Sequence, residues 1–278
     1  MTNRCVGRLP PRCDAEVMSG LAVITGASSG IGAAFSRALA ARGHDLLLIA
    51  RRRAQLEELA ASLSREHSVR VEALAADLIS KDGVESVEQR LHSAGHLELL
   101  VNNAGFGTRG LFFQTDLAGQ DDMHRLHVIA TMRLTRAALP GMIDRNRGGI
   151  INVSSVAGFW QAPGNVSYCA TKAWMNSFTA GLAIETAGTN VRVQALCPGY
   201  TYSEFHQRAG IASDKIPKNF WTTAEQVVAD SLRGLDAGKV FVIPGWRYKL
   251  AVFFMKLVPS TILVPIAKRQ QKKLGRIE

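Results

Sequence analysis

Short apolar stretches alternate along this chain with stretches that have the spacing of amphipathic helices. Strands this continuously apolar are typical of a parallel sheet that helices cover on both faces. Parallel strands need crossover connections of one hand, so the alternation predicts a doubly wound, Rossmann-like α/β fold with a mainly parallel seven-stranded sheet. The strand candidates are residues 21–25, 45–50, 69–75, 97–101, 149–153, 191–197 and 240–243.

No proline- or glycine-rich linker interrupts the alternation, so we expect one domain over residues 20–245. Residues 1–19 have the composition of a flexible N-terminal extension, and residues 246–278 form an apolar and basic C-terminal extension. Hydrophobic residues make up 47% of the chain and charged residues 20%, which suits a buried core.

The formal net charge of +10 raises the question of an anionic partner. Much of the excess lies in the two extensions, and the chain has no zinc-finger or aromatic-basic pattern, so we expect no nucleic-acid binding. The four cysteines lack metal-ligand spacing and no signal peptide is evident. We therefore expect no metal site and a cytoplasmic location.

The first strand candidate runs into a glycine-rich stretch, TGASSGIG (residues 25–32), which opens a helical pattern. A turn of this kind lets the backbone approach a pyrophosphate, and the free N–H groups of the helix bind its oxygens. The position after a strand and before a helix is the context that supports dinucleotide binding. The predicted contacts in this turn are Gly26, Ser28, Ser29, Gly30, Ile31 and Gly32.

The end of the second strand candidate predicts which dinucleotide is bound. NAD enzymes usually carry Asp or Glu there for the ribose 2′-hydroxyl, whereas this chain has Ala50 followed by three arginines. Guanidinium groups bind a 2′-phosphate through paired hydrogen bonds. NADP(H) is therefore the expected cofactor, with Arg51 and Arg52 at the phosphate.

In the stretch GNVSYCATKAW (residues 164–174), Tyr168 precedes Lys172 by four positions, which places both on one face of a helix. This spacing is common by chance, so it indicates a catalytic pair only together with the other motifs. A free tyrosine has a pKa of about 10, and a nearby ammonium favours the phenolate. Such a phenol can donate a proton during reduction of a carbonyl and accept one during oxidation.

These motifs occur in one order with NNAG at 102–105, the serines of NVSS and PG at 198–199. Together they resemble the short-chain dehydrogenase/reductase family over roughly residues 20–245. The resemblance implies an NADP(H)-dependent oxidoreductase that reduces a ketone or aldehyde, or oxidises the matching secondary alcohol.

By motif position, the resemblance implies Tyr168 as the general acid/base, Lys172 as its tuning partner and Ser155 as the substrate-orienting serine, with Ser154 the less favoured neighbour. Tyr168 and Lys172 would also contact the cofactor. The remaining implied cofactor residues are Asp77 and Leu78 near the adenine, Asn103, Ala104 and Gly105 along the cofactor, and Pro198, Gly199 and Thr201 near the nicotinamide and pyrophosphate.

One position departs from the family pattern. Counting back from Pro140, His127 stands where the family usually has an asparagine, which is thought to support a water-mediated proton relay to the lysine. A histidine there would sustain the relay, shift its pH dependence or mark a weakened enzyme. The alternatives are a misplaced register or a structural histidine. His127 therefore joins the candidate catalytic residues.

The segment 200–221 falls where the family's substrate lid lies and is rich in aromatic residues, which suits a hydrophobic carbonyl or alcohol. With the apolar, basic tail, SEF at 203–205 resembles the hydroxysteroid and acyl ketoreductase branch. The tail is expected either to pack as a helix over the pocket or a subunit interface, or to contact an anionic membrane peripherally. Two prolines and Lys256 argue against a membrane span.

Family resemblance also implies a homodimer or homotetramer. The rival function from another class is a non-catalytic NADP-binding redox sensor or a membrane-associated interaction protein. A nucleotide-sugar dehydratase or epimerase is disfavoured, because those enzymes have a longer C-terminal domain and a different glycine spacing.

Overall fold

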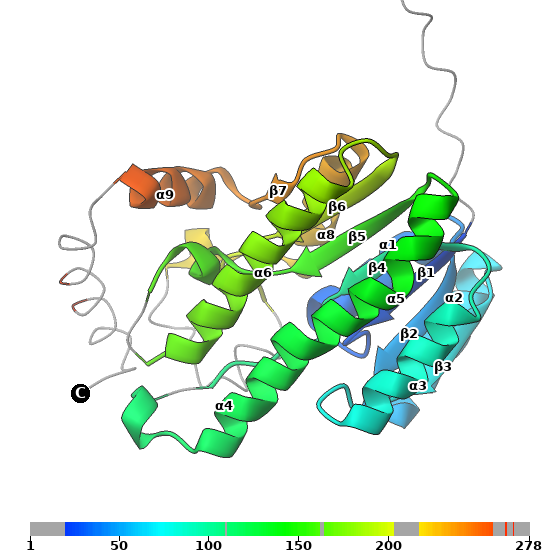
Figure 1. The fold of residues 1–278 in the computed structure, drawn as a ribbon, viewed down its shortest axis with the longest axis horizontal. Helices are drawn as coiled ribbons and strands as arrows, with labels where there is room; N and C mark the ends of the chain where they lie inside the picture. Colours follow the sequence, from blue (N-terminus) through cyan, green and yellow to red (C-terminus); the bar gives the residue numbers. More distant parts are fainter. Residues whose placement is uncertain are drawn as a thin grey trace, which may run out of the picture.

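The computed structural model describes residues 20–108, 110–161, 164–202, 217–257, 265 and 269. One parallel sheet has the strand order β3-β2-β1-β4-β5-β6-β7 (Figure 1). The strands are β1 (Leu21–Thr25), β2 (Asp45–Ala50), β3 (Val71–Ala75), β4 (Leu97–Asn102), β5 (Gly148–Val153), β6 (Val191–Leu196) and β7 (Phe241–Val242).

Helices cover both faces of this sheet, which confirms the predicted doubly wound α/β fold. One face carries α1 (Gly30–Ala40), α2 (Arg53–His67) and α8 (Ala224–Asp236), and the other carries α3 (Lys81–His92), α5 (Thr131–Asp144) and α6 (Val166–Glu185). The described chain also has α4 (Leu117–His124), the π-helical turn η2 (Arg125–Ala130), α9 (Trp246–Leu257) and the 3-10 turns η1 (Phe112–Gln114), η3 (Val156–Phe159) and η5 (Lys218–Phe220).

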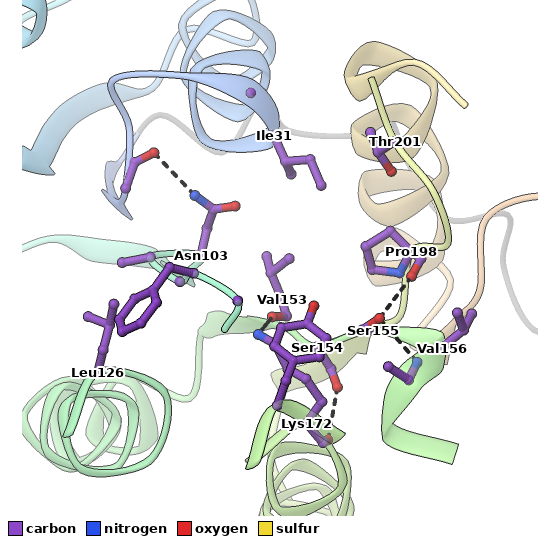
Figure 2. Close-up of a pocket in the computed structure, with 18 of the residues that line it drawn as sticks. Ile31, Asn103, Leu126, Val153, Ser154, Ser155, Val156, Lys172, Pro198 and Thr201 are labelled. Carbon is purple, nitrogen blue, oxygen red and sulfur yellow. Dashed lines mark hydrogen bonds between the residues drawn. The ribbon is translucent and has the colours of Figure 1, made fainter. Parts of the chain in front are cut away.

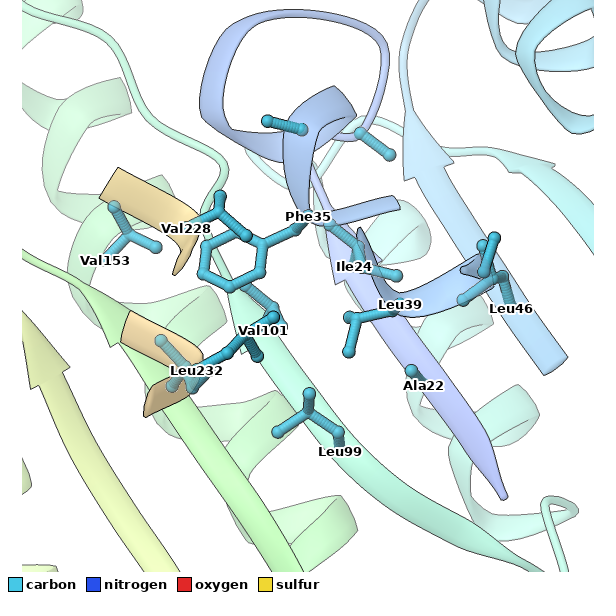
Figure 3. Close-up of a cluster of buried hydrophobic side chains, with 14 of the residues drawn as sticks. Ala22, Ile24, Phe35, Leu39, Leu46, Leu99, Val101, Val153, Val228 and Leu232 are labelled. Atoms are coloured by element: carbon cyan, nitrogen blue, oxygen red, sulfur yellow. The ribbon is translucent and has the colours of Figure 1, made fainter. Parts of the chain in front are cut away.

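The central strands are largely apolar because they bury both of their faces. In β1, Ala22 and Ile24 join one hydrophobic cluster while Val23 between them joins the cluster on the opposite face. On the first face, Phe35 of α1 lies against the sheet beside Val228 of α8 (Figure 3). Two covered faces explain why the central strands β1, β2, β4 and β5 are mostly apolar, whereas β3 at the sheet edge is only partly buried.

The chain leaves β1 in one direction along the sheet, through β2 and β3, and then crosses back to β4 on the other side of β1. This reversal creates a crevice at the carboxyl ends of β1 and β4, where ligands of doubly wound sheets bind.

The expected N-terminal extension, Cys5, Cys13 and residues 203–216 of the expected lid lie outside the described residues, as do most positions after 257. The proposed boundaries at 19/20 and 245/246 therefore stay predictions. In the described part of the chain, no helix has the length and hydrophobicity to cross a membrane.

Candidate functional site

A cavity of about 580 Å³ opens at the carboxyl edge of the sheet. Its walls come from the segments that directly follow β1 to β6, as expected at the reversal of strand order. Every residue expected at the active site or cofactor lines it except Gly32 and His127. Figure 2 shows Ile31 and Asn103 around the same opening as Ser155 and Lys172, although these residues come from four separate segments.

The glycine turn after β1 has, at its glycines, a backbone and close contacts that disfavour any residue with a side chain. Gly26 has a φ of +66°, and a Cβ there would lie 2.9 Å from the Cα of Ala104. At Gly32 a Cβ would lie 2.2 Å from the Gly26 carbonyl oxygen, so Gly32 acts by packing the helix against the turn. Helix α1 begins at Gly30 without a side-chain cap and with no acidic residue in its first turn. Its first N–H groups therefore suit a phosphate.

Thr25 holds the turn against the loop after β4, a role that the sequence did not reveal. Its hydroxyl accepts hydrogen bonds from the backbone N–H groups of Asn103 (2.9 Å) and Ala104 (3.0 Å). The Asn103 side chain in turn donates to the Thr25 carbonyl at 2.8 Å. These bonds fix the spacing between the two segments that border the crevice.

Two of the three arginines after β2 reach this cavity. Arg51 and Arg52 line it, and Arg52 Nη2 donates to Ser28 Oγ of the glycine turn at 3.1 Å. Arg53 instead pairs with Glu57 on the exposed side of α2 at 3.4 Å. Two cations beside a hydroxyl, with no carboxylate at the end of β2, form a cradle that fits a phosphate on the ribose.

The two serines after β5 have different partners. Ser154 Oγ donates to the backbone carbonyl of Lys172 at 3.0 Å and so anchors α6. Ser155 Oγ accepts from the Ala157 N–H at 3.1 Å and donates to the Pro198 carbonyl at 3.4 Å. The Ser155 hydroxyl, with its long bond to Pro198, is the one that suits a ligand.

Tyr168 and Lys172 lie one turn apart on α6, as their spacing predicted. Lys172 is buried, its Nζ donates to the Val153 carbonyl at 2.8 Å, and it lies 5.7 Å from the centre of the Tyr168 ring. Burial lowers the pKa of Lys172 to about 8, although Cys197 nearby partly opposes this shift. The Lys172 ammonium, bound to the Val153 carbonyl, is thus held beside the phenol.

His127 is fully buried in the π-helical turn η2 and does not line the cavity. Its Nε2 accepts from the Phe106 N–H at 3.1 Å, and its Nδ1 lies 3.0 Å from Thr171 Oγ1. Burial lowers its pKa well below the usual value of 6.5, and the charges of Lys172 and His124 lower it further. The imidazole is therefore neutral.

Helix α9 forms one wall of the cavity, as in one of the arrangements expected for the C-terminal extension. Ala251, Val252 and Met255 line it, and Tyr248 is wedged against Gly199, where a Cβ would lie 2.0 Å from the ring. The Tyr248 hydroxyl accepts from the Tyr200 N–H at 3.0 Å and donates to the Phe220 carbonyl at 2.6 Å. Burial raises its pKa to about 12.

Sequence reasoning missed Tyr248, although a signal was present. Tyr248, Ala251, Val252 and Met255 recur at helical spacing, which marks one face of a buried helix. Within the described residues, no group of three or more His, Cys, Asp or Glu side chains could hold a metal ion.

Comparisons with known proteins agree with this architecture. A family model described as short chain dehydrogenase matches residues 20–213. A sulfoacetaldehyde reductase of Chromohalobacter salexigens is 39% identical over 191 residues, covering 68% of this chain and 75% of that protein.

Two solved structures are similar over almost the whole chain. A short-chain dehydrogenase from Sphingobium yanoikuyae in complex with NADPH has a TM-score of 0.77 and 34% identity, covering 93% of this chain and 96% of that one. A bulky-bulky ketone specific alcohol dehydrogenase from Comamonas testosteroni has a TM-score of 0.73 and 30% identity, covering 93% and 95%. With the glycine turn, the Tyr168–Lys172 pair and the strand order already in place, these matches show that the chain belongs to the short-chain dehydrogenase family.

Proposed function

We propose that this protein is an NADP(H)-dependent oxidoreductase that interconverts a ketone or aldehyde and the matching alcohol. The observation that carries the proposal is the buried Lys172 beside the Tyr168 ring, in the cavity that the glycine turn also lines. The family match supports an oxidoreductase, and the solved relatives that contain NADPH support the cofactor.

The residues that would hold NADP(H) lie in the glycine turn, at the start of α1 and after β2. The turn around Gly26 and the start of α1 would bind the pyrophosphate, and Arg51 and Arg52 would bind the 2′-phosphate. When bound, NADPH supplies the hydride that the carbonyl carbon accepts.

The protein's own contribution is to the oxygen of that carbonyl. Tyr168 Oη would donate its proton to the oxygen as negative charge develops there, which leaves a phenolate on the protein. The Ser155 hydroxyl would donate a hydrogen bond to the same oxygen. The Lys172 ammonium stabilises the phenolate, because an opposite charge nearby favours the ionised form of a phenol. In oxidation the phenolate accepts the proton of the alcohol.

The cavity favours an apolar substrate. Its described lining includes Phe106, Trp160, Phe220, Val252 and Met255. Apart from Arg51, Arg52 and Asp77, which we assign to the cofactor, Lys172 is the charged side chain among the described lining residues. Apolar walls with a few convergent polar groups are typical of sites for hydrophobic ligands. The match to an alcohol dehydrogenase specific for bulky ketones supports the same class.

A substrate screen that follows NADPH absorbance tests this proposal. We expect turnover with aromatic, steroid-like or long-chain ketones, and a much lower rate when NADH replaces NADPH. Absence of cofactor oxidation across all three ketone classes, in both directions, would contradict an oxidoreductase of this type.

We also propose peripheral contact of α9 with an anionic membrane. Trp246, Leu250, Phe253 and Phe254 recur at helical spacing and are exposed, while the opposite side of α9 faces the cavity. Residues 239–277 contain nine Lys and Arg and no Asp or Glu. An exposed apolar helix in a basic segment suits the interface of an anionic bilayer.

Sedimentation with phosphatidylserine-containing vesicles tests this contact. Binding should weaken with added salt and in a Phe253→Ser/Phe254→Ser variant, whereas Ile184→Ser, at an exposed position of α6, should bind as the parent does. Equal sedimentation with purely zwitterionic vesicles would overturn the charge argument.

A homodimer or homotetramer, as the family resemblance implies, is our proposal for the assembly, and sedimentation velocity tests it.

A further inference from the structure

His127 connects two segments that border the cavity but are distant in sequence. On one side, its Nε2 accepts the N–H of Phe106, in the cavity-lining loop 103–108, which we term the cofactor-side loop. On the other side, its Nδ1 lies 3.0 Å from Thr171 Oγ1, and that hydroxyl donates to the Tyr168 carbonyl at 3.0 Å. The imidazole thus joins the cofactor-side loop to the turn of α6 that carries Tyr168.

The direction of these hydrogen bonds determines the proton position on the ring. A backbone N–H can only donate, so Nε2 must present its lone pair to Phe106. The single ring proton then lies on Nδ1 and is donated to Thr171 Oγ1, whose own proton goes to the Tyr168 carbonyl. In this series of three hydrogen bonds, each nitrogen of the ring and the Thr171 hydroxyl proton has one partner. A doubly protonated ring would point its Nε2 proton at the Phe106 N–H.

Packing reinforces the same connection. The His127 ring meets the Tyr168 ring edge-on at 6.0 Å and 72°, and it lies at 6.0 Å from the Phe106 ring. Gly105 is needed for this approach, because a Cβ there would lie 2.8 Å from His127 Nε2. His127 therefore contacts both the loop and the side chain that we propose as the acid/base.

The surrounding charges also disfavour a protonated ring. Lys172 from α6 and His124 from α4 are the charged or titratable groups that lower its pKa, and burial acts in the same direction. A relay through His127 would require the ring to break one of its two bonds and to carry a positive charge near Lys172.

We propose that His127 is a positioning residue which, with Thr171 and Gly105, ties the cofactor-side loop to α6 and orients Tyr168, and that it transfers no proton. The proposal rests on the proposed function for the role of Tyr168, but the connection itself belongs to the protein without any ligand. It replaces the relay role expected from the family position with a mechanical one.

Hydrogen exchange in the cofactor-free protein tests the connection directly. His127→Ala should speed exchange of the Phe106 amide by about fivefold or more, as expected for the loss of one neutral hydrogen bond. Thr171→Val, which keeps the side-chain shape, should act in the same direction, and Thr171→Ser should restore the parent rate. His124→Ala is the matched control, because in the described part of the chain the His124 ring hydrogen-bonds within its own helix, to the Gln120 carbonyl at 2.8 Å.

Kinetics separate positioning from proton transfer. With a ketone substrate, His127→Ala and Thr171→Val should each lower kcat by about tenfold or more, less than additively in the double variant, because misplacement slows the chemical step. The shape of the kcat–pH profile should stay the same in both variants. Loss of a titration step in His127→Ala, with Thr171→Val unaffected, would overturn the proposal in favour of a relay.

Unchanged Phe106 exchange in both variants would also overturn it. If the parent protein shows no turnover with any ketone, the proposed function fails, while the exchange rates still decide whether the connection exists. If His127→Ala does not fold, Thr171→Val alone gives the same decision.

Discussion

Tyr168→Phe should lower kcat by about a thousandfold, the range expected when a general acid is removed. The substitution deletes one oxygen from a half-buried ring and keeps its packing against His127. The carbonyl oxygen would then gain charge without a proton donor, and the ammonium of Lys172 would have no phenolate to stabilise. Stopped-flow measurement of NADPH oxidation provides the rate.

Affinity for NADPH should change by no more than about twofold, because the cradle at the glycine turn and the arginines stays intact. Energy transfer from Trp160, which lines the cavity, reports that affinity. Tyr202→Phe is the matched control, since this tyrosine is exposed and stacks on Trp221 at 4.8 Å. A Tyr168→Phe enzyme that retains more than a tenth of its activity would exclude Tyr168 as the proton donor.

Arg51→Ala/Arg52→Ala should reduce the preference for NADPH over NADH by about a hundredfold or more, measured as the ratio of kcat/KM values. Each hydrogen bond between charged groups contributes about 1.5–3 kcal/mol, and both Arg51 and Arg52 line the cavity. Arg52→Glu should lower the NADPH/NADH ratio of kcat/KM values still more, because a carboxylate repels the 2′-phosphate and accepts hydrogen bonds from a 2′-hydroxyl.

Arg53→Ala serves as the control for this series. Arg53 follows the same strand but pairs with Glu57 on the surface and does not line the cavity. Its removal should leave the cofactor ratio unchanged. An unaltered ratio in Arg51→Ala/Arg52→Ala would mean that the phosphate is bound elsewhere or that the protein does not discriminate between the two cofactors.

The parts of the site that the sequence predicted are those with strict local requirements. Gly26 needs a positive φ, and Tyr168 and Lys172 need only a helix to share one face. The central strands could be found because both of their faces are buried, which leaves a mostly apolar stretch. The predicted strand at 69–75 began two residues early, since Val69 and Arg70 precede β3.

Other roles depended on partners that no local pattern identifies. Thr25 was visible as the first residue of the glycine stretch, but its bonds to Asn103 and Ala104 span more than 70 positions of the chain. Tyr248 likewise finds its partners near Gly199 and Phe220 only once α9 has packed over the cavity. For His127, the family position suggested a relay, whereas its bonds to Phe106 and Thr171 favour positioning.

By itself the sequence determined the fold class, the glycine turn and the shared face of Tyr168 and Lys172, because glycine conformation and helical spacing act over a few positions. Only the tertiary structure showed that α9 forms a wall of the cavity and which segments Thr25 and Tyr248 connect. It also showed which groups hydrogen-bond to the two nitrogens of the His127 ring. Those outcomes depend on distances between segments far apart in the chain, and packing of the two helical layers on the sheet sets these distances.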